Sequence, residues 1–279
     1  MLCNTLTGMI DILMSTYNGA RFLAAQIDSI LAQDHTEFRL IIRDDGSTDE
    51  TMKMVEDYTV RDPRVVFVKD DRGNLGAPRS FMALVEASKS ELLMLADQDD
   101  IWLPDKVSRT LFKMNQVLEE QGGNVPLAVF TDLTVVNEQL DVINASFWNY
   151  QKLEPLLSRR WQDLLAQNVV TGCTLMLNQA AKKAVLPFQL PEMMHDHWIA
   201  ANVAKYGKLE FVAEPTVLYR QHSQNAEGAR DFGPRYSLSK LSGLSDRFSF
   251  YRRAATVFGD TSALGLSFRK LSLNLKRLI

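Results

Sequence analysis

Short apolar runs alternate with amphipathic segments four times in the first half of the chain, and this alternation restricts the fold more than any other feature. The apolar runs occupy residues 9–14, 38–43, 64–68 and 92–96. All four runs predict strands, the continuous run at 92–96 predicts one buried on both faces of a sheet, and the segments between the runs have helical spacing. A repeated strand–helix unit favours parallel strands joined by right-handed crossovers. The predicted fold class is therefore α/β, with a mostly parallel central sheet flanked by helices.

Polar residues stand at each of the four strand-to-helix junctions, at 15–18, 44–47, 70–76 and 97–100. In a parallel sheet these junctions share one edge, the carboxyl edge, where α/β proteins bind ligands. We therefore expect the four polar segments to converge on a single site.

The fourth junction places Asp97, Asp99 and Asp100 within four positions, directly after the apolar run 92–96. Three carboxylates this close repel one another, so a positive partner is expected. Mg²⁺ or Mn²⁺ is suitable, because hard divalent cations prefer carboxylate oxygen and also bind phosphate. The alternative is a solvated acidic turn that caps the next helix.

Composition narrows the functional class. The 279 residues are 46% apolar and 23% charged, as in globular proteins, and the net charge of −3 argues against a nucleic-acid partner. Cys3 and Cys173 are far apart, which predicts neither a disulfide framework nor a cysteine metal site. No apolar run reaches the ~18 residues of a membrane span, and no signal peptide is recognisable. The cytoplasm is the expected location.

The second half is less regular. Its pattern predicts strands at 127–130, 171–177, 209–212 and 216–220, and helices at 161–166 and from Asp196 onward. Two further local signals are a capping box from Ser47 to Glu50 and helix starts at Pro78 and Pro104. No flexible linker separates the halves. The expected division is a domain over 1–230, made of a first half (1–130) and a second half (131–230), followed by a basic helical tail (231–279).

Five motifs at these junctions carry a family resemblance. In order they are Ser-Thr-Tyr-Asn-Gly at 15–19, Asp-Asp-Gly-Ser-Thr-Asp at 44–49, Asn-Leu-Gly at 74–76, Asp-Gln-Asp-Asp at 97–100 and His-Asp-His-Trp at 195–198. The series resembles the family 2 glycosyltransferases of GT-A fold, and Ala-Asp-Gln-Asp-Asp-Ile-Trp at 96–102 is most like the bacterial rhamnosyltransferase branch. The resemblance covers about residues 9–225.

The resemblance implies an inverting, metal-dependent transferase. Its donor would be a nucleotide-diphospho-sugar, dTDP-rhamnose in that branch, and its acceptor a lipid-linked saccharide in bacterial surface polysaccharide synthesis. The Asp-x-Asp pattern makes Asp99 the expected metal ligand, with Asp97 on the metal or the ribose. His222 would complete the metal shell, although a structural role is the alternative. For Asp100, a cap of the next helix is the alternative to a catalytic role.

The resemblance also implies a donor-binding set. Asp45 would accept from the pyrimidine N–H. Helix capping is the alternative role for Asp44 and Asp45, and one of the two acids is expected to be a cap. Tyr17 would line the base and Ser15 would add polar contacts. The remaining expected sugar or phosphate partners are Asn74, Gly76, Arg79, Arg220 and Arg230. An ordinary turn remains the alternative for Asn74 and Gly76.

Asp196 is the expected general base, which would take the proton of the acceptor hydroxyl as that hydroxyl attacks. The alternatives are a helix-capping role for Asp196 or a histidine base. A metal chelate by His195 and His197 is not expected, because residues two apart do not share a helix face.

The tail is basic and amphipathic. Residues 231–279 hold nine Lys or Arg against three Asp. An apolar stripe with cations around it comprises Leu264, Phe268, Leu271, Leu275 and Leu278. Such a helix can lie on an anionic membrane surface, here the inner face of the plasma membrane. Packing on the protein core or on a second subunit is the alternative.

Two other functions use similar parts. A sugar-nucleotide nucleotidyltransferase also binds a nucleotide and a metal on an α/β sheet, but needs a basic Gly-rich loop. Residues 15–21 offer one Gly and one Arg. A non-catalytic nucleotide-sugar-binding protein is the other alternative.

Overall fold

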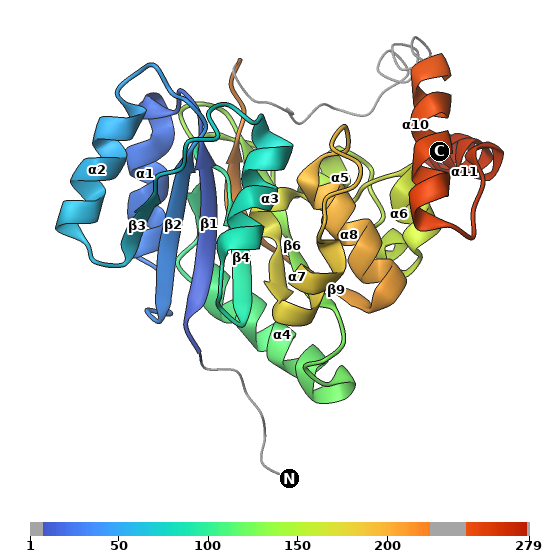
Figure 1. Cartoon of the computed structure of the whole chain (residues 1–279), viewed down its shortest axis with the longest axis horizontal. Coiled ribbons are helices and arrows are strands. Elements are labelled where there is room, and N and C mark those ends of the chain that lie inside the picture. Colours follow the sequence, from blue (N-terminus) through green and yellow to red (C-terminus); the bar gives the residue numbers. More distant parts are fainter. Residues whose placement is uncertain (1–7, 224–243, 278–279) are drawn as a thin grey trace.

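The computed structural model describes residues 8–223 and 244–277, and a single nine-stranded sheet runs through it. The strands are β1 (Ile10–Thr16), β2 (Phe38–Asp44), β3 (Val65–Val68), β4 (Leu92–Ala96), β5 (Ile101–Trp102), β6 (Leu127–Val136), β7 (Val142–Asn144), β8 (Met176–Asn178) and β9 (Lys208–Arg220). Their order is β3-β2-β1-β4-β8-β6-β9-β5, with β7 paired to β6. Figure 1 shows β3, β2, β1 and β4 next to one another in this order.

Helices cover both faces of the sheet. They are α1 (Ala20–Leu31), α2 (Thr51–Arg61), α3 (Ala77–Ala87), α4 (Lys106–Gln121), α5 (Phe147–Tyr150), α6 (Trp161–Ala166), α7 (Gln179–Val185), α8 (His195–Tyr206), α10 (Leu244–Phe258) and α11 (Ala263–Lys276). Two 3₁₀ turns, η1 (Pro155–Arg159) and η2 (Gly172–Thr174), lie between α5 and β8. Figure 1 places α2 at one end of the molecule and α10 and α11 at the other.

The first four strands are parallel, as the alternation predicts. In β1, Ile12 pairs with Leu40 of β2 and with Met94 of β4. Beyond β4 the sheet is mixed, because β8 runs antiparallel to both β4 and β6, while β6 and β9 are parallel. The carboxyl ends of β1, β2, β3 and β4 therefore share one edge, where the polar junctions lie.

Two buried clusters, one on each face, explain why most residues of the strands are apolar. Leu13 and Leu95 belong to the cluster that includes α3, α7 and α8. Ile12 and Met94 belong to the opposite cluster, with α1, α2 and α4. Since side chains alternate along a strand, burial on both faces favours apolar residues at successive positions, and the buried Asp11 and Arg43 are ion-paired instead.

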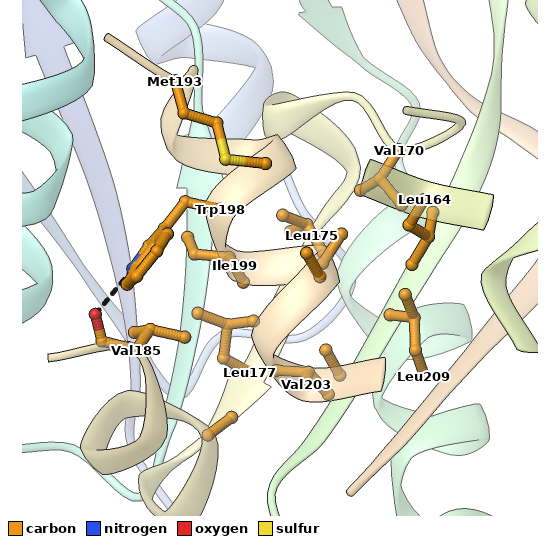
Figure 2. Close-up of a cluster of buried hydrophobic side chains, with 14 of the residues drawn as sticks. Leu164, Val170, Leu175, Leu177, Val185, Met193, Trp198, Ile199, Val203 and Leu209 are labelled. Carbon is orange, nitrogen blue, oxygen red and sulfur yellow. Dashed lines mark hydrogen bonds between the residues drawn. The ribbon is translucent and has the colours of Figure 1, made fainter. Parts of the chain in front are cut away.

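Helix α8 is held firmly in the first of these clusters. The indole N–H of Trp198 donates to the Val185 carbonyl at 2.7 Å, which satisfies the buried donor (Figure 2). Ile199 and Val203 are fully buried on the same helix. This packing fixes the first turn of α8, where His195 and Asp196 lie.

Several sequence-based boundaries are wrong. The predicted strand 171–177 is the η2 turn followed by the short β8, because the Gly172 N–H donates to Asp196 rather than to a sheet partner. The two predicted strands at 209–212 and 216–220 form one strand, β9, with register shifts opposite Asp132. Strand β6 also continues past 130 to Val136.

The predicted capping box is also absent from α2. Ser47 instead accepts from the Asn18 N–H at 2.8 Å and donates to Asp44 at 2.6 Å, which ties the first two junctions together. Helix α2 begins at Thr51, whose N–H donates to Asp49. Pro78 lies in the first turn of α3 as predicted, but α4 begins at Lys106, two positions after Pro104.

The C-terminal helices pack against the rest of the protein. Tyr251, Phe258 and Leu266 are buried in the same cluster as Trp198. The predicted division at 130 and 230 remains a prediction, and residues 231–243 lie outside the described part. No helix within residues 8–223 and 244–277 has the length and apolarity to span a membrane.

Candidate active site

A cavity of about 530 Å³ opens at the carboxyl edge of the sheet, where the four polar junctions meet. Eight of the predicted site residues line it: Ser15, Tyr17, Asp45, Asn74, Gly76, Asp97, Asp99 and Asp196. The first seven come from the junctions after β1 to β4, and Asp196 comes from the first turn of α8. Segments far apart in the sequence therefore form one site.

A buried arginine organises the donor side of the cavity. Arg43, at the end of β2, donates to Asp45 at 2.6 Å and to Asp70 at 2.9 Å. It also donates to the carbonyl of Gly73 at 2.8 Å. Its hydrogen bonds hold the pKa of Asp70 down at about 2. The loop between β3 and α3 is thereby attached to β2 through one cation.

Asp45 fixes the same loop through its backbone. Its Oδ1 accepts from the Leu75 N–H and its Oδ2 from the Gly76 N–H, both at 2.8 Å. Gly76 has φ +76°, a left-handed conformation that favours glycine. Asp44 accepts instead from the N–H groups of Gly46 and Ser47 and so stabilises the turn after β2. The two neighbouring acids thus have different roles, and only Asp45 lines the cavity.

The Asp-Gln-Asp-Asp turn has a buried and an open side. Asp97 and Asp99 line the cavity, whereas Asp100 is fully buried. Burial, followed by the charges of Asp99 and Asp196, raises the pKa of Asp97 to about 7. Burial also raises the pKa of Asp100 well above its usual value. Asp100 does not cap the next helix, which is the alternative role for it, because Asp105 is the residue that precedes α4.

Asp100 instead belongs to a buried polar group behind the turn. Its Oδ1 accepts from the Arg220 N–H at 3.1 Å. The Sγ atom of Cys173 and one carboxylate oxygen each of Asp97 and Asp100 lie within 4.8 Å of one another. Lys106 is fully buried nearby, with its ammonium 4.6 Å from the Trp102 ring centre. Burial lowers the pKa of this lysine to about 8.

His222 lies beside the turn that carries Asp99. Its Nε2 is 2.9 Å from Asp99 Oδ2, and its ring packs 4.7 Å from the ring of Phe22. The carboxylates of Asp97 and Asp99 and the imidazole of His222 are ligand types that Mg²⁺ and Mn²⁺ bind. The cavity wall contains Asp45, Asp97, Asp99 and Asp196 and, among the described residues, no Lys or Arg. The residues present therefore fit a divalent cation.

Two predicted phosphate partners do not line the cavity. Arg220 donates through Nε to the Asp99 carbonyl at 2.8 Å and through Nη1 to the Glu138 carbonyl at 2.7 Å. Its guanidinium therefore supports the turn that carries Asp99. Arg79 is exposed on α3, outside the cavity wall. Arg230 lies outside the described residues.

Asp196 occupies the opposite part of the cavity. Its Oδ2 accepts from the Gly172 N–H at 3.1 Å and its Oδ1 from the His197 N–H at 2.5 Å. Met194 precedes the helix, so Asp196 is in the first turn and is not the capping residue. The helix N-terminus favours the ionised carboxylate there. The carboxylate is thus held in place by backbone donors.

The histidines on either side of Asp196 pack in different places. The His195 ring stacks on Phe81 at 4.1 Å, and neither ring nitrogen has a hydrogen-bond partner. His197 Nε2 is 2.6 Å from the Leu164 carbonyl. Burial lowers the pKa of His195 to about 3 and that of His197 to about 4. Both rings are therefore neutral at pH 7.

Sequence reasoning missed several residues of the site. Gln98 exchanges two hydrogen bonds with the backbone of Tyr17, at 2.9 and 3.0 Å, and so joins the first and fourth junctions. Gly172 lies against His195, since a Cβ there would come 2.7 Å from Nε2. Of these missed residues, Arg43 could have been identified from the sequence. A cation at the end of an apolar strand is expected to be buried and therefore to need acidic partners.

Known proteins share these features. Residues 11–121 match the model of Glycosyl transferase family 2. A dTDP-rhamnosyl transferase, RfbG, of Shigella flexneri is 25% identical over 264 residues, which cover 90% of this chain and 84% of the relative. An uncharacterized glycosyltransferase of Nostoc sp. is 26% identical over 77% of this chain, and the match spans 66% of that relative's length.

A solved structure has the same architecture. The mannosyltransferase PcManGT of Pyrobaculum calidifontis, in complex with GDP-Man and Mn²⁺, matches 95% of this chain and 80% of its own, with a TM-score of 0.56 and 15% identity. The likeness shows a shared fold. The chain has the GT-A fold, and over residues 11–121 it is similar to Glycosyl transferase family 2.

Proposed function

We propose that this glycosyltransferase is metal-dependent and inverting, and that it transfers a sugar from a nucleoside diphosphate to a saccharide acceptor. One observation carries the proposal: Asp196 and the Asp97–Asp99 turn line the same cavity. One cavity can therefore hold the leaving diphosphate and, on the opposite face of the donor sugar, the attacking hydroxyl. The family match favours a transferase over the nucleotidyltransferase and non-catalytic alternatives.

Asp99 and His222 would hold the cation, with Asp97 as a further ligand or as the ribose partner. A bound Mg²⁺ or Mn²⁺ supplies Lewis-acid stabilisation of the charge on the departing diphosphate. The cavity wall needs such a charge, because four carboxylates without a lining cation repel a diphosphate.

Asp196 would act as general base on the acceptor hydroxyl. The two backbone N–H donors orient its carboxylate toward one position. The histidine alternative is weaker, since a buried imidazole with a pKa of about 3 takes up a proton poorly at pH 7.

The donor would be dTDP-rhamnose, as in the name of the Shigella relative. Asp45 Oδ2 accepts one backbone N–H and has capacity for a second, such as the ring N–H of thymine. Tyr17 is half-exposed in the wall and offers a surface for the base. Ser15 and Asn74 add polar groups nearby.

Asp196→Asn tests the assignment of the base. We expect dTDP-rhamnose to bind the variant with unchanged affinity in calorimetry, while transfer falls by at least about 100-fold, within the range of general base catalysis. The matched control is Asp246→Asn on the exposed start of α10, which should retain activity. Unchanged turnover with Asp196→Asn would remove the base assignment. If the wild-type protein turns over another nucleotide sugar and not dTDP-rhamnose, the proposed donor is wrong and the base assignment stands.

The acceptor would be lipid-linked, with α11 on the anionic inner face of the plasma membrane. Leu264, Phe268, Leu271 and Leu275 are 62%, 69%, 57% and 54% exposed, while Leu266 and Leu273 on the same helix are buried. Leu278 lies outside the described residues. The outward stripe and the basic tail match an anionic bilayer.

Substitution of the stripe is a better test than truncation, because α10 and α11 bury core residues. We expect full-length protein to pellet with phosphatidylglycerol vesicles and less so with phosphatidylcholine vesicles. Phe268→Ser combined with Leu271→Ser should abolish pelleting, whereas Val60→Ser, at an 88% exposed position on α2, should not. Equal pelleting of all three proteins would contradict membrane contact through α11.

A further inference from the structure

Ser15 is joined to the buried Arg43 through a second hydroxyl, that of Ser80. Ser15 and Arg43 are partners in the register of β1 and β2, and Ser80 comes from α3, which packs on the face of β1 that carries Leu13. Arg43 Nη1 donates to Ser80 Oγ at 2.8 Å, and the oxygens of Ser80 and Ser15 lie 2.6 Å apart. Hydrogen bonds therefore lead from a buried cation to Ser15 in the cavity wall.

The neighbours of the Ser80 hydroxyl determine the direction of these hydrogen bonds. A guanidinium only donates, and Arg43 uses each of its five N–H groups in one hydrogen bond, so Ser80 accepts from it. Ser80 is fully buried, and among the described residues its oxygen has only Arg43 and Ser15 as partners. The hydrogen of Ser80 consequently points to Ser15, because a buried donor without an acceptor is costly.

Ser15 Oγ thus accepts from Ser80, and the hydrogen of Ser15 is left for another partner. The Ser15 side chain has no second hydrogen bond within residues 8–223 and 244–277, and it is partly exposed in the cavity wall. Hydrogen bonds in a chain polarise one another, so a chain that begins at the Arg43 cation strengthens the last hydroxyl as a donor. Toward a ligand in the cavity, Ser15 therefore acts as a hydrogen-bond donor.

Asp45 offers the opposite character in the same part of the wall. Arg43 Nη1, which bonds Ser80, also donates to Asp45 Oδ1 at 2.6 Å, so one nitrogen joins the acid to the two hydroxyls. Asp45 Oδ2 accepts from the Gly76 N–H and has capacity for a further donor. Asp45 and Ser15 both line the cavity, which thus presents an acceptor and a donor held by a common cation.

We propose that Arg43, acting through Ser80, makes Ser15 a specificity-determining donor that binds a carbonyl oxygen of the nucleotide base, beside the ring N–H that Asp45 would accept. The inference rests on the proposed function, because it takes the cavity to bind a nucleoside diphosphate. Thymine and uracil have a carbonyl on each side of one ring N–H. The site would therefore select a pyrimidine with this imide edge.

Thiated nucleotides test the inference, because sulfur is a weak hydrogen-bond acceptor. The probes are dTDP and its 2-thio and 4-thio analogues, which keep the ring N–H, each titrated by calorimetry into full-length protein saturated with Mg²⁺. We expect one of the two analogues to bind about 3- to 10-fold more weakly than dTDP, the range of one hydrogen bond. That analogue identifies the carbonyl that Ser15 binds.

Two substitutions assign the difference in affinity to the hydroxyls. Ser15→Ala should abolish the difference, and Ser80→Ala should reduce it at least about twofold, because the Ser15 hydroxyl is then no longer held in one orientation. Ser88→Ala is the matched control. Ser88 is also buried, at the end of α3, and donates to the Asp11 carboxylate at 2.5 Å, but it lies outside the cavity wall. This control should retain the full difference.

Equal affinity of the wild-type protein for the three nucleotides, or a difference that persists in Ser15→Ala, would overturn the inference. A full difference in Ser80→Ala would overturn the role of Ser80. Ser15→Ala leaves the contacts of Arg43 intact, so it decides the test even if Ser80→Ala does not fold. Absence of binding by all three nucleotides would overturn the inference together with the proposed donor. Selective binding without any transferase turnover would contradict only the proposed function.

Discussion

His222 Nε2 lies 2.9 Å from Asp99 Oδ2, although 123 positions separate the two residues in the sequence. The contact joins the segment after β9 to the turn after β4. Because both side chains are mostly buried, at 5% and 15% exposure, the pair is held in one geometry. A divalent cation bound at Asp99 would therefore have the imidazole beside it.

His222→Gln should weaken the metal site without removing Asp99. We expect the Mn²⁺ concentration for half-maximal donor turnover to rise about 10- to 100-fold, the usual cost of losing a partner of a metal ligand. Calorimetric titration with Mn²⁺ gives a second readout that does not depend on turnover. His35→Gln, between α1 and β2, serves as the control. An unaltered Mn²⁺ titration in the His222 variant would assign this histidine a structural role.

Arg43→Met should destabilise the fold, because it leaves the buried Asp45 carboxylate without its cation. The guanidinium and Asp45 side chains are only 2% and 4% exposed. Removal of one partner of a buried pair costs about 3–5 kcal/mol, measurable by urea unfolding. Arg72→Met is the matched control, since Arg72 also bonds Asp70 but is 46% exposed, and should cost under about 1 kcal/mol. Similar losses from both variants would refute the special role of Arg43.

Gly172→Ala should slow transfer while leaving nucleotide binding intact. The new Cβ would meet His195 Nε2 at 2.7 Å and must displace the ring or the loop that donates to Asp196. A shift of about 1 Å at a base can cost about 100-fold in rate. The control is Gly123→Ala, whose Cβ has open space apart from Leu118 at 4.0 Å. Steady-state kinetics would show whether kcat falls, as expected, with KM for the donor unchanged.

His195 should make the protein less stable as the pH falls. Burial lowers its pKa to about 3, so below pH 6.5 the unfolded chain gains a proton that the folded chain does not. This contribution is fully present above pH 6.5 and falls by about 1.4 kcal/mol per pH unit toward pH 4.

Comparison with a variant isolates that contribution, because the raised pKa of Asp97 acts in the opposite direction over the same range. The unfolding free energy of His195→Gln, relative to wild type, should rise as the pH is lowered from 6.5 to 4. His197→Gln should behave similarly, since burial lowers the pKa of His197 to about 4. If the unfolding free energy of each variant relative to wild type does not change with pH, these rings take up a proton as readily in the folded protein as in the unfolded chain, and the prediction is wrong.

Local patterns predicted much of the fold and of the site. The four strands, the parallel order of their carboxyl ends and the convergence of the polar junctions all follow from consecutive residues. Predictions failed where a local signal had a distant competitor. Ser47 bonds Asn18 instead of capping α2, and Gly172 bonds Asp196 instead of joining a strand. A capping box and a strand cannot form once their hydrogen bonds are taken by other segments.

The sequence by itself determined the strand–helix alternation and the chemical character of the sheet edge, because apolar periodicity and junction composition are properties of neighbouring residues. Only the tertiary structure decided which charges meet. It buried Arg43 between Asp45 and Asp70, turned Arg220 toward the Asp99 carbonyl, and placed His222 beside Asp99. These contacts depend on strand order and on the paths of long connections, which no local pattern specifies.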